Sequence, residues 1–136
     1  MIQSLFQIVS NECIARNPYK IVLSGDVSSI NRHGQFVNIK LKGFFLRRPI
    51  SVCDIDRSEN TLTIVYKVVG KGTEFMSRLP MNEQLDVLAG LGNGYDTSLC
   101  GEHPLLIGGG AGVPPMFLLA KQLISEGKIP MVIAGF

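Results

Sequence analysis

Two adjacent arginines, Arg47 and Arg48, stand directly before Pro49, Ile50 and Ser51. A guanidinium group offers a planar fork of N–H donors that suits a phosphate group or an electron-rich ring. The hydroxyl group of Ser51 can donate or accept a hydrogen bond beside it. The segment therefore predicts a site for an anionic or aromatic ligand. Taken alone, the solvated start of a strand explains the same residues.

A second candidate is the segment from Gly70 to Thr73, which precedes a short predicted helix that ends near Arg78. Glycine lets a ligand approach the backbone, and the N–H groups at the start of a helix favour anions. Thr73 is expected to cap this helix, with Glu74 in its first turn. An ordinary capped turn is an equally good explanation of this segment alone. Together with an arginine of the first segment on a neighbouring strand, it predicts a site that holds one pyrophosphate between them.

A third candidate is the glycine run from Gly108 to Gly112, which lies between a predicted strand and a predicted helix. In parallel α/β sheets this position holds a pyrophosphate at the start of the helix. The spacing differs from the dinucleotide pattern G-x-G-x-x-G, because its third glycine would fall on Val113. No G-K-[ST] follows, so the run is not a P-loop. We predict nucleotide contacts at Gly109, Gly110 and Gly112, with a purely structural turn as the alternative.

The other reactive side chains do not form a recognisable site. Cys13, Cys53 and Cys100 are odd in number and contain no C-x-x-C pair, which argues against a disulfide framework and a closed metal site. His33 and His103 are isolated, and no serine has the histidine and carboxylate partners of a catalytic triad. The sequence predicts no metal site and no catalytic acid, base or nucleophile.

Composition narrows the class of protein. A formal net charge of +2 gives no reason to expect nucleic acid or a membrane surface as partner. No stretch approaches the roughly 20 apolar residues of a spanning helix, and no secretory signal is apparent. We therefore expect a cytoplasmic protein. Because 46% of its residues are apolar, the chain can form a substantial core.

The elements that must position the first two candidates are short strands separated by turns. Val37, Ile39 and Leu41 alternate with polar residues, as in a half-buried antiparallel strand. The candidate strands cover residues 6–14, 19–24, 34–41, 49–55, 61–69 and 84–89. Short strands at this spacing, with one short helix, predict an antiparallel, Greek-key β-barrel over residues 1–100.

The pattern changes after Cys100. Residues 104–107 form a short apolar strand, residues 113–126 a helix that ends at Gly127, and residues 130–134 a second apolar strand. Strand, glycine turn, helix and strand open a parallel α/β sheet, which requires further strands and helices. We predict that residues 101–136 are the incomplete start of an α/β nucleotide-binding domain.

Five motifs occur in the order and spacing of the ferredoxin-reductase superfamily. They are Gly34-Gln35-Phe36-Val37, Arg48-Pro49-Ile50-Ser51, Gly70-Lys71-Gly72-Thr73, Leu91-Gly92-Asn93-Gly94-Tyr95 and the turn from Gly108 to Pro115. The Arg-Arg-Pro-Ile-Ser form most resembles the electron-transfer subunit of type B dihydroorotate dehydrogenase, and the resemblance covers essentially the whole chain.

The resemblance implies a role for three of these motifs. Arg48, Pro49, Ile50 and Ser51 would line FAD, with Arg48 near its pyrophosphate and Ser51 near the reactive edge of the flavin ring. Contacts from the next strand would come from Val65, Tyr66 and Lys67. Gly72 and Thr73 would bind the phosphates, and the glycine turn would begin a partial NAD site.

The implied function is electron transfer in pyrimidine biosynthesis. Electrons from a dihydroorotate-oxidising flavoprotein subunit would pass through a [2Fe–2S] cluster to FAD and then to NAD, within a hetero-oligomer. The cysteines of this chain do not match the ligands of that cluster. Two alternatives stay open: another ferredoxin or NAD(P)H reductase subunit of the same superfamily, and a truncated FAD-binding remnant without catalytic activity.

Overall fold

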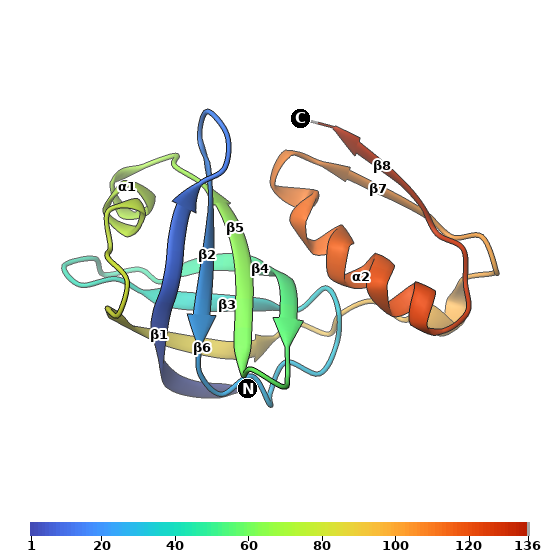
Figure 1. Cartoon of the computed structure of the whole chain (residues 1–136), viewed down its shortest axis with the longest axis horizontal. Helices are drawn as coiled ribbons and strands as arrows, with labels where there is room; N and C mark the ends of the chain where they lie inside the picture. The colour runs from blue at the N-terminus through green and yellow to red at the C-terminus, as the bar shows by residue number, and fades with distance from the viewer. Residues whose placement is uncertain (136) are drawn as a thin grey trace.

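A computed structural model describes residues 1–135 and consists of a β-barrel followed by a small α/β unit (Figure 1). The barrel strands are β1 (Ile2–Cys13), β2 (Pro18–Ser24), β3 (Phe36–Lys40), β4 (Arg48–Asp56), β5 (Thr61–Lys67) and β6 (Gln84–Leu91). Their order around the closed barrel is β1-β2-β5-β4-β3-β6, and every neighbouring pair is antiparallel. The predicted antiparallel barrel is confirmed.

The strand alternation places the core inside this barrel. Val37, Ile39 and Leu41 are all buried, as their alternation with polar residues predicts. Side chains from all six strands meet them in one cluster. The fully buried members of greatest volume include Phe6, Ile8, Ile21, Leu23, Ile30, Leu62 and Ile64.

The short helix α1 (Lys71–Ser77) differs from the prediction at its start. Gly70, in an extended conformation, is the residue that caps the helix, and Thr73 lies three positions later. The hydroxyl oxygen of Thr73 accepts hydrogen bonds from the backbone N–H groups of Val69 at 3.0 Å and Gly70 at 3.2 Å. The predicted cap at Thr73 is therefore wrong in position, because this side chain reaches back to the turn from inside the helix.

The α/β unit follows the barrel and contains β7 (Leu105–Gly109), α2 (Pro114–Ser125) and β8 (Met131–Gly135). The two strands pair in parallel, and α2 covers one face of this sheet (Figure 1). Short 3-10 turns, η1 (Thr97–Leu99) and η2 (Gly110–Gly112), precede β7 and α2. The predicted strand–helix–strand unit is confirmed, although its first strand continues into the glycine run.

Helix α2 also packs against the barrel. Leu118 on this helix contacts the barrel core, and the ammonium group of Lys121 lies 2.7 Å from a carboxylate oxygen of Asp54 on β4. The α/β unit is therefore held beside β4 and β5, the strands that carry the predicted flavin contacts.

Two of the sequence motifs hold in place the segment that connects the barrel to the α/β unit. The buried side chain of Gln35 accepts hydrogen bonds from the backbone N–H groups of Asn31 and Arg32, and donates one to the carbonyl oxygen of Gly92. Gly34 adopts a φ of 90° and contacts the ring of Tyr95, which leaves no room for a Cβ atom. These motifs therefore fix the connection between the two parts of the molecule.

Within residues 1–135, no helix is both long enough and apolar enough to span a bilayer.

Candidate functional site

The ladder between β4 and β5 stops halfway along the two strands. Residues 52–56 of β4 pair with residues 61–64 of β5, whereas residues 48–51 pair only with β3 and residues 65–67 only with β2. The register shifts at Cys53, next to the last pair of the ladder, Val52 and Ile64. The facing edges of residues 48–51 and 65–67 thus have backbone groups available to a ligand.

The side chains at this gap point in two directions. Ile50 packs against the barrel core, and Val52 and Tyr66 are buried. Because strand side chains alternate, the neighbouring positions face outward. These outward residues are Pro49, Ser51, Val65 and Lys67. Among the predicted flavin contacts, Ile50 can therefore offer its backbone, while the outward residues can offer their side chains.

Arg48 and Gly72, two residues predicted to share a pyrophosphate, are in contact. The guanidinium group of Arg48 lies against the α-carbon of Gly72, where a Cβ atom would stand 2.6 Å from the guanidinium carbon. The same group lies 5.2 Å from the ring centroid of Phe44 and donates a hydrogen bond to the carbonyl oxygen of Leu46. A Cβ atom at position 72 would therefore displace the guanidinium group from its place at the start of α1.

Arg47, its neighbour in sequence, has a different environment. Its guanidinium group lies 3.0 Å from a carboxylate oxygen of Asp86 on β6 and donates to the carbonyl oxygen of Asn38 at 3.1 Å. The two arginines of the motif therefore separate into one that ties barrel strands together and one, Arg48, that lies at the gap. Thr73 has a structural role as well, because its hydroxyl group is engaged at the start of α1.

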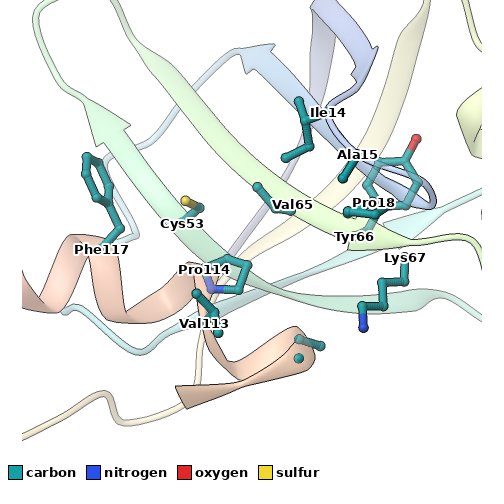
Figure 2. Close-up of a pocket in the computed structure, with 12 residues that line it drawn as sticks. Ile14, Ala15, Pro18, Cys53, Val65, Tyr66, Lys67, Val113, Pro114 and Phe117 are labelled. Carbon is teal, nitrogen blue, oxygen red and sulfur yellow. The ribbon is translucent and has the colours of Figure 1, made fainter. Parts of the chain in front are cut away.

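A cavity of about 470 Å³ lies between the gap and the α/β unit (Figure 2). On the barrel side, Val65 and Cys53 face Val113 and Pro114 of the α/β unit, and Phe117 stands at one end. The full lining is Ile14, Ala15, Pro18, Cys53, Val65, Tyr66, Lys67, Gly110, Ala111, Val113, Pro114 and Phe117. Both parts of the molecule are needed to form this apolar cavity.

Lys67 is the one cationic side chain among these lining residues. Its ammonium group reaches toward the glycine turn (Figure 2), 3.6 Å from where a Cβ atom on Gly110 would stand. Around Gly109 and Gly112, the space that a Cβ atom would enter is open, whereas Gly108 is packed against the carbonyl group of Gly112. The predicted nucleotide contacts therefore have open backbone with a positive charge beside them.

Burial keeps two ionisable groups of the barrel wall, Tyr66 and Cys53, neutral. It raises the pKa of the Tyr66 phenol, whose hydroxyl group bonds to the side-chain oxygen of Asn11 at 3.0 Å and points away from the cavity. Burial, followed by the charge of Asp54, raises the pKa of the Cys53 thiol. Neither group is suited to release a proton into the cavity near neutral pH.

Several lining residues were missed by the sequence interpretation. The alternation along β4 could have found Cys53, which lies two residues after Ser51. The hairpin residues Ile14, Ala15 and Pro18 carry no motif, because their role depends on where the β1–β2 hairpin lies. Phe117 follows the prolines by one turn of α2, so the helical period alone gives it no functional meaning.

The described cysteines do not fit a [2Fe–2S] cluster. Cys13 lies on β1, Cys53 on β4 and Cys100 after η1, and all three are free thiols. Across residues 1–135, no three cysteine, histidine or acidic side chains gather as metal ligands would. A cluster bound by four thiolates has no ligand set in this part of the chain.

Comparisons with known proteins agree with the fold described above. No protein-family model matches the chain. It is 44% identical over 135 residues to dihydroorotate dehydrogenase B (NAD(+)), electron transfer subunit, of Fusobacterium nucleatum subsp. nucleatum, covering 95% of this chain and 52% of that protein. The chain spans about half the length of the curated relatives it matches.

Solved structures share the fold. An NADH-dependent reduced ferredoxin-NADP oxidoreductase superposes with a TM-score of 0.85 at 31% identity, covering 96% of this chain and 48% of that one. A ferredoxin NADP+ reductase from Neisseria gonorrhoeae with bound FAD and NADP has a TM-score of 0.77 at 16% identity, covering 97% and 56%. The chain is a homologue of the electron transfer subunit of dihydroorotate dehydrogenase B over about half of that subunit, with the FAD-binding domain fold of ferredoxin reductase-like flavoproteins.

Proposed function

We propose that the chain binds FAD at the gap between β4 and β5 and exchanges electrons with a nicotinamide nucleotide through the adjoining cavity. One observation carries the proposal. The ladder between β4 and β5 stops at Val52 and Ile64, which leaves a gap with Arg48 and the start of α1 at one end and an apolar cavity beside it. A flat aromatic ring system with a pyrophosphate tail matches these three features.

The residues present fit FAD. Arg48 would bind the pyrophosphate, with the start of α1 at Gly70 and Gly72 beside it. Pro49, Ile50 and Ser51 would face one edge of the flavin ring, and Val65, Tyr66 and Lys67 the other. The free backbone groups of both edges, together with the hydroxyl group of Ser51, would hydrogen-bond the polar rim of the ring.

A nicotinamide nucleotide would enter from the α/β unit. Gly109, Gly110 and Gly112 leave room for a phosphate near the backbone, and Lys67 supplies a positive charge beside Gly110. Val113, Pro114 and Phe117 would exclude water from the cavity and hold the nicotinamide against the barrel wall. This chain supplies part of the NAD site, and we propose that residues 1–100 and 101–136 belong to separate FAD and NAD domains.

FAD, when bound, supplies the exchange of a hydride with nicotinamide and of single electrons with a one-electron carrier. The chain contributes binding, orientation and the exclusion of water. No proton transfer is assigned to a side chain, since the Tyr66 and Cys53 side chains stay neutral and Lys67 is positioned as a cation.

The whole protein would serve as the electron-transfer subunit of a cytoplasmic dihydroorotate dehydrogenase, paired with a flavoprotein that oxidises dihydroorotate in pyrimidine biosynthesis. The names of the relatives support this assignment. The test mixes the FAD-loaded chain, in its longest natural form, with that catalytic subunit. Co-purification and bleaching of the FAD absorbance by dihydroorotate are the expected results. Reduction of NADP by ferredoxin without that subunit would contradict the assignment.

A second candidate is a reductase subunit that serves ferredoxin and NADP, favoured by the likeness to a ferredoxin-NADP oxidoreductase at 31% identity. Its FAD site would be the same, so the partner that reduces or oxidises the flavin separates the two. A chain that neither binds FAD nor restores activity to a partner would instead be a non-catalytic remnant.

A further inference from the structure

A small cavity of about 130 Å³ lies on the far side of the barrel–α2 junction, and nothing in the proposed flavin site uses it. Its floor is apolar, and its rim carries Asn31, Arg32 and His33 of the loop before β3, Arg57 after β4, and Gln122 of α2. We propose that this cavity binds a small oxyanion of the phosphate class, which bridges the barrel to α2.

Positive charge dominates the rim. Arg32 and Arg57 both line the cavity, and none of its lining residues is acidic. Neither arginine lies within 4.0 Å of a carboxylate in the described part of the chain, unlike Arg47, Arg78, Lys121 and Lys128. Arg57 donates one hydrogen bond, to the carbonyl oxygen of Ile30 at 2.6 Å, which leaves its other N–H groups available.

His33 supplies an independent observation. Its ring nitrogen Nε2 is enclosed and has no hydrogen-bond partner among residues 1–135. An enclosed polar atom without a partner is costly, so the His33 ring, which lines the cavity, would gain a hydrogen bond by turning Nε2 toward an anion held by Arg32 and Arg57.

The loop that presents these groups is rigid before any ligand arrives. Gln35 accepts hydrogen bonds from the backbone N–H groups of Asn31 and Arg32, each at 3.0 Å. The backbone N–H of Tyr95 donates to the carbonyl oxygen of His33, also at 3.0 Å. Because these hydrogen bonds already fix the loop, it needs little further ordering when an anion binds.

The acidic side chains of Asp96 and Glu126 lie near the rim, and their negative charge limits the affinity of the cavity for an anion. The charge of Arg32 helps to lower the pKa of Asp96, so these two groups are close enough to interact. One N–H of the Gln122 amide donates to Glu126 at 3.0 Å, which leaves the other free. Arg57 has no such neighbour among the described ion pairs and should contribute most to anion binding.

The test titrates inorganic phosphate into the 136-residue chain by calorimetry at constant ionic strength, with chloride as the balancing salt. Arg48→Ala is the background, so that phosphate cannot bind at the proposed pyrophosphate site. We expect one saturable site whose affinity falls about tenfold or more in Arg57→Gln, because charged hydrogen bonds are lost. Arg16→Gln, which removes a charge elsewhere, should leave the affinity unchanged.

A second variant keeps the test decisive if Arg57→Gln fails to fold. Arg32→Gln removes a rim charge whose one described hydrogen bond goes to the carbonyl oxygen of Asn93. It should weaken phosphate binding, and phosphate should shift the NMR signals of the His33 ring. No saturable binding, or equal binding in the Arg32→Gln and Arg16→Gln variants, would overturn the proposal. FAD binding is measured separately, so either proposal can fail without the other.

Discussion

At the scale of single residues, the two arginines of one motif have different tasks. Arg47 is paired with Asp86 on another strand, whereas Arg48 lies against Gly72 and over the ring of Phe44. Sequence spacing could indicate that a guanidinium group is useful here, but not which of the two neighbours lies at the gap between β4 and β5. The structure places Arg48 there, where the missing side chain of Gly72 leaves room for its guanidinium group.

Replacement of Arg48 with alanine should weaken FAD binding by roughly tenfold to a hundredfold, because a charged hydrogen bond is worth about 1.5–3 kcal/mol. The measurement is a titration of FAD followed by quenching of its fluorescence. Arg47→Ala is the matched control, since it should lower the stability of the barrel and leave FAD affinity nearly unchanged. Equal losses of affinity in the two variants would show that the pyrophosphate is misplaced.

Cys53 offers a chemical probe of the cavity. Burial and the charge of Asp54 raise the pKa of its thiol, so iodoacetamide should modify it more slowly than the exposed Cys13 at slightly alkaline pH. Saturating FAD should slow the modification of Cys53 further and leave Cys13 unaffected, as mass spectrometry of the modified peptides can measure. If FAD does not change the rate at which Cys53 is modified, the flavin binds elsewhere.

At the scale of elements, the gap between β4 and β5 is the feature that creates the site. The strands were predictable from alternation, as at Val37 and Ile39, and so was the α/β unit after Cys100. The early end of the β4–β5 ladder could not be predicted, because it depends on where β4 pairs with β3 and β5 pairs with β2 in the folded barrel. The cap of α1 was misassigned for a related reason, since Thr73 looks like a cap in sequence but bonds backward from within the helix.

The turn η1, which leads into the α/β unit, should respond to pH through Asp96. Its carboxylate accepts hydrogen bonds from Ser98, and these lower its pKa below the ordinary value of 3.8. A lowered pKa means that the stabilising contribution is present above pH 3.8 and is lost as the pH falls through the folded-state value.

Asp96→Ala should therefore unfold in less urea than the parent chain at neutral pH, and the difference should shrink on acidification below pH 3.8. Circular dichroism at each pH gives the two midpoints. Asp96→Asn, which keeps an acceptor for Ser98, is the matched control and should lose less. A difference that stays constant across this range would exclude a contribution from the charge.

At the scale of the whole molecule, the candidate site exists because two parts of the chain meet. The barrel supplies Val65 and Lys67, and the α/β unit supplies Val113 and Phe117. The motifs around Gln35 and Tyr95 hold that arrangement, a role that the sequence analysis did not assign to them. A resemblance can assign motifs to a family. Only the folded structure shows which motifs line the cavity and which hold its two sides together.

The central claim is that this chain is a working flavin site. The most direct measurement is an absorption spectrum of the purified chain before and after FAD is added and free flavin is removed. Flavin bands with about one FAD per chain are the predicted result. A chain that stays colourless after incubation with FAD would contradict the claim and leave the barrel as a fold without its cofactor.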